Sequence, residues 1–405
     1  MKFIILQDIP YRRPEGALAQ YHGAIWAEEL RRRGHEATKM VIGDPNAISP
    51  KSPLLSLSTP EQRRDPAFWR EQDADCVLFY AGPSVGCVDV IRAIKKGSPL
   101  TKVVSRIEAY WAPRKQAPRS VVRLFRECYA NKRHCPTERF DFEKRAILPA
   151  LLRTVAATSR LWLRPSGNAL IQLVEASDRT TFFFPRLVEE TQQYLRTSNR
   201  PDLLDRIVWS GYPVRPEFRP PEPGGKQPGS VISIANWRHF KDPELTADAM
   251  SIVLRTNPQA SFTVIGQKSD RVANRILASV PNAAPRVHSF DHVENRRIPE
   301  LLARAQVFLL CSYREGIPSV LSEALCCGCS LALSTGPAVG AFRDYLEHGD
   351  GTQAASRRPR DMADAVLTEL AQWRLNNRDS SAISKRWNGT AVSSLCDELI
   401  QVVQP

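Results

Sequence analysis

The 405-residue sequence has no long hydrophobic run. Its N-terminus offers only the short apolar stretch from Phe3 to Leu6, far less than a secretory signal needs and far short of the roughly 18 residues of a membrane-spanning helix. The nine cysteines are odd in number and scattered, which is not the pattern of a disulfide framework. We therefore expect a cytoplasmic protein that does not span a membrane.

Patterns for metal and nucleic-acid binding are also missing. Cys326, Cys327 and Cys329 lie close together in the sequence, but no second pair of Cys or His completes a zinc site. We expect these cysteines to be buried packing residues, and we expect no metal and no cofactor. Aromatic residues do not alternate with the basic ones, as they would in a surface that stacks nucleotides, so we expect no nucleic-acid partner.

The positive charge is concentrated in one part of the chain. The net charge is +13, and the stretch from Thr101 to Leu170 holds fifteen Lys and Arg against five Asp and Glu. Within it, the segment from Ser120 to Arg133 has an apolar stripe surrounded by basic residues. Such a helix fits an anionic membrane surface, which would make the protein peripheral at the inner membrane face. It equally fits a helix packed on the core with a solvated basic face, and both interpretations stay open.

The order of expected elements predicts an α/β fold. A strand from Lys2 to Leu6, a helix that ends at Gly34 and a strand from Ala37 to Ile42 form a strand, helix and strand unit of a parallel sheet. After a Pro- and Gly-rich interruption the same alternation resumes at Ser230. We therefore predict two Rossmann-like doubly wound parallel-sheet domains that face each other across a cleft, with ligands at the carboxyl ends of the strands.

Domain boundaries follow from this alternation. Residues 1–214 are expected to form the N-terminal domain, and residues 215–229 the linker, because eight Pro and Gly fall within it. Residues 230–386 would form the C-terminal domain. Residues 387–405 would form a terminal helix that crosses back to the N-terminal domain.

The segment from Ser312 to Ala324 carries the strongest chemical signal. It follows an expected strand and opens a helix, where Pro318 is tolerated in the first turn. Free amides and the helix dipole make this a site for an anion such as a diphosphate. Glu315 precedes the helix and Glu323 lies inside it, and carboxylates are natural acceptors for paired sugar hydroxyls. Two glutamates alone could be surface charges, but the strand, loop and Pro-started helix together favour a binding site.

A second candidate loop follows the first expected strand of the C-terminal half. Arg238 and Lys241 lie in this loop, and their charges can neutralise a diphosphate. A solvated basic turn is the alternative interpretation.

Together these motifs resemble glycosyltransferase family 4, whose hallmark is two glutamates separated by seven residues in this setting. The resemblance implies the two-domain GT-B fold. It implies that Glu315 contacts hydroxyls of the donor sugar and Glu323 the ribose of the nucleotide. The chain at Gly316, Ile317, Pro318, Ser319 and Val320 would line the diphosphate and the sugar.

The same resemblance assigns roles to the basic loop and to the N-terminal domain. Lys241 would hold the donor diphosphate and act in catalysis together with Glu315. Asn236 stands where the family usually has arginine, so Arg238 would take over that role. The family usually has paired glycines after its first strand, and here Gly16 alone is the candidate.

The function that the resemblance implies is retaining, metal-independent transfer of a hexosyl group from a nucleotide-diphosphate sugar, bound by the C-terminal domain. The basic stretch from Thr101 to Leu170 suggests a lipid-linked glycan or a cell-surface polysaccharide intermediate as the acceptor, which would bind on the N-terminal side. Two alternatives stay open. One is a nucleotide-sugar epimerase of the same fold, and the other is a non-catalytic subunit that binds nucleotide sugar.

Overall fold

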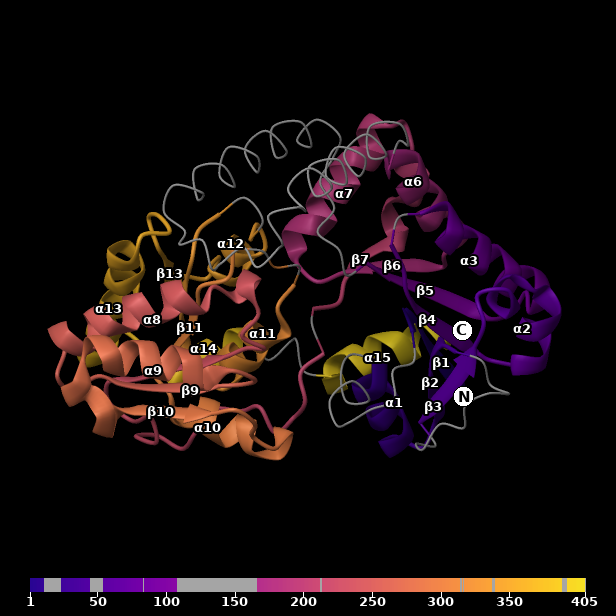
Figure 1. Cartoon of the computed structure of the whole chain (residues 1–405). Helices are drawn as coiled ribbons and strands as arrows, with labels where there is room; N and C mark the ends of the chain where they lie inside the picture. The colour runs from indigo at the N-terminus through magenta and orange to yellow at the C-terminus, as the bar shows by residue number, and fades with distance from the viewer. Residues whose placement is uncertain are drawn as a thin grey trace, which may run out of the picture. The chain divides into compact units, whose positions relative to one another are not determined.

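The computed structural model describes residues 1–10, 23–43, 54–82, 84–107, 166–211, 213–313, 315, 317–336, 339–387 and 392–404. These residues fold into two compact units (Figure 1). The first unit contains the described residues up to Arg215 together with the last helix, α15 (Val392–Val403). The second unit contains the described residues from Pro216 onward to Trp387. The chain therefore leaves the first unit at Arg215 and returns to it for its last helix.

The first unit is built on a seven-stranded sheet with the order β3-β2-β1-β4-β5-β6-β7. Every neighbouring pair is parallel. Because the order reverses between β1 and β4, the sheet is doubly wound. Its strands are β1 (Lys2–Pro10), β2 (Glu36–Ile42), β3 (Leu55–Ser58), β4 (Cys76–Tyr80), β5 (Lys102–Ile107), β6 (Arg179–Phe182) and β7 (Ile207–Trp209).

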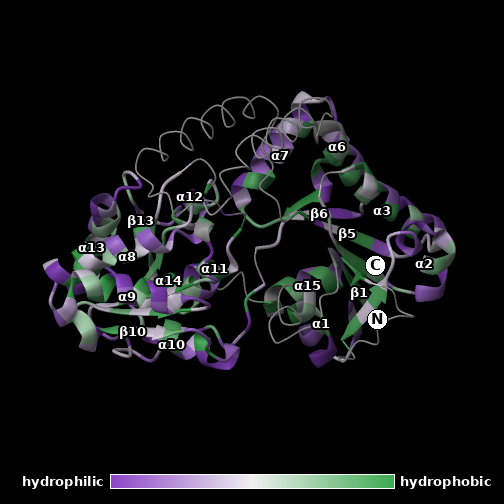
Figure 2. Cartoon of the chain, in the orientation of Figure 1, coloured by the Kyte–Doolittle hydropathy of each residue, from purple (hydrophilic) through white to green (hydrophobic). Residues whose placement is uncertain are grey.

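Helices connect these strands, and α15 completes their packing. Buried side chains of β1 and of α1, among them Ile5 and Trp26, form one core cluster with Leu395 and Leu399 of α15. The buried strands of this unit are mostly green in Figure 2, as this core requires. The helices are α1 (Gly23–Arg32), η2 (Gln62–Arg64), α2 (Pro66–Gln72), α3 (Val85–Gly97), α6 (Ser166–Ala176), α7 (Pro185–Thr197) and η4 (Pro201–Arg206).

The second unit has a six-stranded parallel sheet with the order β10-β9-β8-β11-β12-β13. This is the strand order 3-2-1-4-5-6 of a dinucleotide-binding sheet, and the order reverses between β8 and β11. The strands are β8 (Ser230–Ile234), β9 (Ser261–Ile265), β10 (Val287–Phe290), β11 (Val307–Leu310), β12 (Ser330–Leu333) and β13 (Gly351–Gln353).

The helices of the second unit alternate with these strands. They are η5 (His239–Lys241), α8 (Pro243–Thr256), α9 (Ser269–Ser279), η6 (Pro281–Arg286), η7 (Asn295–Arg297), α10 (Ile298–Arg304), α11 (Ser319–Cys326), α12 (Phe342–Tyr345), α13 (Pro359–Arg374) and α14 (Ser380–Trp387). Lys226, near the start of this unit, ties helices α10 and α11 together. Its ammonium donates to Ala305 O at 2.6 Å and to Cys327 O at 2.9 Å, just beyond the last turns of these helices. Carbonyls at helix ends lack intrahelical donors, so this cation satisfies them.

The prediction of two doubly wound parallel sheets is confirmed. One strand was predicted too short, because β1 runs beyond Leu6 to Pro10 and pairs with β4 as far as Gln7. Among the described helices, none combines the length and apolar composition that a bilayer crossing requires. The basic segment from Ser120 to Arg133 lies outside the described residues.

Candidate functional site

The strand order of the second unit fixes where a ligand would bind. β8 and β11 are adjacent and parallel, and they lie at the point where the strand order reverses. In such sheets the crevice for a ligand opens beyond the carboxyl ends of these two strands. The loop after β8 leads to Asp242 and the loop after β11 leads to Pro318, so both candidate loops lie at this edge.

The loop after β8 is held by a buried tryptophan and by a helix cap. The Trp237 indole nitrogen donates to Ile265 O at 3.0 Å, which fixes the first half of the loop against β9. Asp242 adopts a left-handed backbone conformation, and its carboxylate accepts a hydrogen bond from Leu245 N at the start of α8. This cap ends the loop one residue after Lys241, whose side chain is largely buried. Arg238 lies in the same loop with an exposed side chain.

The loop after β11 is held in place by the hydroxyl of Tyr345. The Tyr345 hydroxyl donates to Pro318 O at 3.1 Å, and Ser322 Oγ lies 3.3 Å from the same hydroxyl. Burial raises the pKa of the Tyr345 phenol, so the hydroxyl keeps its proton and remains a donor. Pro318, in an extended conformation, directly precedes the first residue of α11. The positive end of the α11 dipole therefore points toward this sheet edge.

Arg357, which sequence reasoning did not select, joins the two loops. Its guanidinium donates to Asp242 Oδ2 at 2.6 Å in one loop. In the other loop it donates to Cys311 O at 2.8 Å and to Ser312 O at 2.9 Å. The planar fork of arginine suits such multiple contacts, which a lysine could not reproduce. A lone arginine between β13 and α13 gives no sequence signal, because its role depends on the fold.

Lys241 and Glu315 come together at the meeting point of these loops. The Lys241 ammonium donates to Glu315 Oε1 at 2.5 Å. The exposed fractions of the two side chains are 16% and 9%, so the pair is largely removed from water. A backbone hydrogen bond from Tyr313 N to Phe240 O at 3.0 Å ties the loops beside it. The structure thus places two of the predicted site residues in direct contact.

The other predicted residues lie around this pair. Ser319 and Val320 occupy the first turn of α11, and Glu323 lies further along the same helix with a half-buried side chain. Ile317 is half-buried and Pro318 is buried. Gly16 and Gly316 lie outside the described residues.

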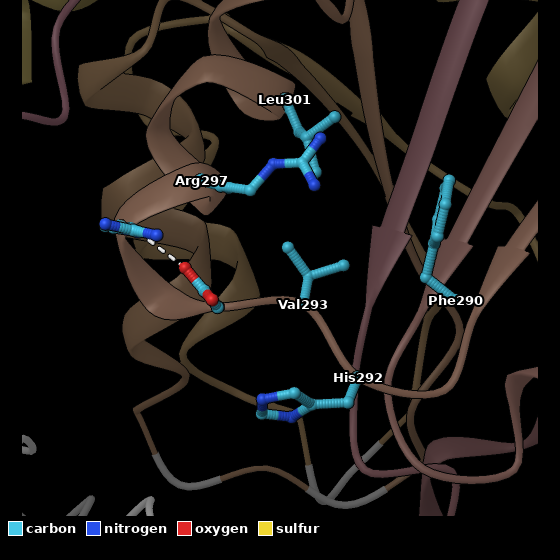
Figure 3. A pocket seen from close by; sticks show the side chains of 7 residues that line it. Phe290, His292, Val293, Arg297 and Leu301 are labelled. Carbon is cyan, nitrogen blue, oxygen red and sulfur yellow. Dashed lines mark hydrogen bonds and ion pairs between the residues drawn. The ribbon is translucent and has the colours of Figure 1, made fainter.

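A separate hollow opens at the same sheet edge, directly after β10 (Figure 3). Its volume is about 290 Å³. Phe290 at the end of β10 is 44% exposed, and in Figure 3 it lies on the strand side, with Val293 and Arg297 on the helix side. The lining residues are Phe290, His292, Val293, Glu294, Arg296, Arg297 and Leu301. Sequence reasoning missed this hollow, because the four-residue strand β10 was not predicted.

The clustered cysteines are buried in this unit. Cys326, Cys327 and Cys329 are at most 5% exposed, and the Cys329 thiol contacts Leu302 O at 3.0 Å. At the end of β11, burial raises the pKa of the Cys311 thiol to about 12. A thiol with a raised pKa is a poor nucleophile and a poor metal ligand. Within the described residues, no three His, Cys, Asp or Glu side chains are grouped so that they could hold a metal ion.

One protein-family model matches part of this chain. Residues 214–386 match the family model of glycosyl transferases group 1, so the match covers the second unit and both candidate loops. No curated protein resembles the chain closely enough in sequence to count as a match.

Solved structures show the same fold over the whole chain. HepE of Anabaena, solved in complex with UDP, aligns with a TM-score of 0.61 at 11% identity over 100% of this chain and 99% of its own. The lipopolysaccharide outer core galactosyltransferase WaaB aligns with a TM-score of 0.57 at 11% identity, covering 100% and 99%. Sucrose-phosphate synthase of Thermosynechococcus elongatus aligns with a TM-score of 0.55 at 13% identity, covering 99% and 98%. The fold is the two-domain fold of GT-B glycosyltransferases.

Proposed function

We propose that this chain is a retaining glycosyltransferase of family 4 that takes a sugar from a nucleotide-diphosphate donor. The observation that carries the proposal is the placement of Lys241 and Glu315 at the switch point of the second sheet, beside the start of α11. This position supplies a cation, a helix dipole and a carboxylate at one place. The cation and the helix dipole suit a diphosphate, and the carboxylate suits sugar hydroxyls.

The donor would lie along the sheet edge from β11 to β10. The amides at Gly316, Ile317, Ser319 and Val320 would take the phosphates, and Glu323 the ribose. The hollow after β10 would hold the base, because it offers the exposed ring of Phe290 beside the apolar side chains of Val293 and Leu301. HepE, which shares the fold, was solved with UDP, in keeping with a nucleotide ligand.

The chemistry that fits this site is heterolysis of the bond between the sugar and the diphosphate. Negative charge then develops on the departing diphosphate, where fixed cations and amides stabilise it best. Lys241 would supply the cation, and Arg238, in the same loop, would add a second one. We propose that this charge stabilisation makes a divalent metal unnecessary. The acceptor hydroxyl would attack from the face that the leaving group departs from, and its proton would pass to the departing phosphate oxygen, so the sugar keeps its configuration.

We further propose a lipid-linked or cell-surface glycan as the acceptor, with the protein at the inner membrane face. The basic segment from Ser120 to Arg133 supports a membrane surface as partner, since its charge is opposite to that of anionic lipids. The shared fold of a lipopolysaccharide galactosyltransferase is in keeping with this acceptor. Sucrose-phosphate synthase has the same fold, so the fold itself does not select an acceptor.

The test is an assay of purified protein with UDP-, GDP- and ADP-sugars, with and without a glycolipid extract. Transfer should release nucleoside diphosphate and label the extract, and added chelator should not reduce it. Glu315→Ala and Lys241→Met should each abolish labelling while the far-ultraviolet circular dichroism stays unchanged. An epimerised sugar formed without acceptor would identify an isomerase instead, and full activity of Glu315→Ala would remove the assignment.

A further inference from the structure

We propose that the ion pair between Lys241 and Glu315 makes the site prefer a nucleoside diphosphate that still carries its sugar over the bare diphosphate. This inference rests on the proposed donor site, and it adds a selection step to it. In the structure, the lysine that would bind the diphosphate is occupied by the carboxylate that would bind the sugar. The diphosphate can therefore bind the lysine, and the sugar the glutamate, only when this ion pair is broken.

Hydrogen bonds hold the two loops together beside the ion pair. The hydrogen bond from Tyr313 N to Phe240 O joins the loops next to the pair. Arg357 joins them again through Asp242 and Ser312 O. Lys241 Nζ also lies 5.4 Å from the centroid of the Phe240 ring, a distance at which the ring face attracts the cation. A ligand that takes the ammonium would therefore displace the Glu315 carboxylate by side-chain rotation, because these hydrogen bonds resist separation of the loops.

A bare diphosphate meets an electrostatic penalty at this site. If Glu315 stays in place, its negative charge lies beside the incoming phosphates, and like charges in a poorly hydrated site repel strongly. If Glu315 rotates away, a carboxylate only 9% exposed loses the Lys241 ammonium as its partner. Either way, part of the attraction between Lys241 and the phosphates is cancelled.

A donor with its sugar offsets this penalty. Sugar hydroxyls donate hydrogen bonds, so they can satisfy the displaced Glu315 carboxylate while the diphosphate takes the ammonium. The repulsion between Glu315 and the phosphates thus makes the site specific, because only a donor that still carries its sugar relieves it. Once the sugar has left, Glu315 regains Lys241 and displaces the product diphosphate. The pair would therefore favour donor binding and product release together.

The test is calorimetric titration of wild type and Glu315→Gln with UDP and UDP-glucose, GDP and GDP-mannose, and ADP and ADP-glucose. The amide keeps the shape of Glu315 but removes its charge. Glu315→Gln should bind the bare diphosphate about tenfold more tightly than wild type, which corresponds to ~1.4 kcal/mol, and should lose the preference for the sugar-bearing donor. Glu315→Ala should bind the bare diphosphate more tightly too, which repeats the test with the side chain removed.

Asp364→Asn is the matched control. Asp364 forms an exposed pair with Arg360 on α13, and its substitution changes the net charge by the same amount. It should leave all affinities unchanged. Equal or weaker binding of the bare diphosphate by Glu315→Gln would overturn the inference while leaving the donor site intact. If wild type binds none of the six ligands, the proposed function fails as well.

Discussion

Arg357 donates a hydrogen bond to the carboxylate of Asp242, which lies 115 residues earlier in the sequence, at 2.6 Å. The exposed fractions of these side chains are 12% and 10%. Because the same guanidinium also binds carbonyls that follow β11, it is the link through which the two loops of the candidate site hold their spacing. Arg357 is therefore a positioning residue that acts through the two loops.

We predict that Arg357→Met lowers the free energy of unfolding by about 3 kcal/mol, since it removes the arginine cation from a buried ion pair. It should also weaken binding of nucleotide sugar about tenfold, because the two loops separate. Chemical denaturation and titration calorimetry measure the two effects. Arg358→Met is the neighbouring control, because Arg358 is 77% exposed. A loss of stability with unchanged ligand affinity would show that Arg357 has no positioning role.

Gly266 lies where the loop after β8 approaches the end of β9. It has φ of +116°, and a Cβ built on it would lie 1.9 Å from Ala235 O. Gly266→Ala should therefore displace the start of the loop and lower the free energy of unfolding by roughly 3 kcal/mol or more. Gly349→Ala is the control, because Gly349 also has positive φ, +74°, but no atom lies within 4 Å of its added Cβ. It should cost only about 1 kcal/mol. Equal losses in urea denaturation would contradict the close approach.

Glu29 in α1 ties the first unit together through charge. Its carboxylate accepts hydrogen bonds from Arg32 at 2.8 Å and Arg33 at 2.9 Å, and Arg33 also pairs with Asp397 of α15. The hydrogen bond from Arg32 lowers the pKa of Glu29 most, while burial opposes this shift. A carboxyl whose pKa is lower in the folded state stabilises the fold above its unfolded pKa, and this contribution disappears as the pH falls through the folded pKa.

We therefore predict that Glu29→Gln lowers the melting temperature at neutral pH, with a loss of about 1 to 3 kcal/mol. The difference from wild type should shrink as the pH falls below about 4, where the wild-type carboxyl takes up a proton too. Thermal melts across this pH range, followed by circular dichroism, measure it. A difference that stays constant with pH would mean that the carboxylate charge is not what stabilises α1.

Local patterns predicted much of the second unit. The sequence predicts strands over residues 230–235 and 306–311 and a helix over residues 318–327. The observed β8, β11 and α11 lie within a residue of these bounds, because buried apolar runs and helix starts are encoded locally. β10 was missed because its pattern is not that of a buried strand. Its last three residues are exposed, so no apolar run marks them.

The sequence selects the residues of the candidate site but does not indicate which of them pair. Lys241 and Glu315 are 74 residues apart, and only the adjacency of β8 and β11 brings them together. The direct contact between Lys241 and Glu315 could not be predicted either, because the motif around each residue indicates a ligand group that it would bind and not a contact with the other residue. Arg357 shows the same limit, since its partners belong to two loops that meet only in three dimensions.

Because α15 supplies Leu395 and Leu399 to the core of the first unit, the hydrophobic core against the N-terminal sheet is complete only once α15 has been made. During synthesis this sheet emerges first from the ribosome, yet it must wait for the final helix before its apolar surface is covered. The described part of the second unit runs from Pro216 to Trp387 and needs no segment that is made later. The half that is made last is therefore expected to be the half that finishes folding first.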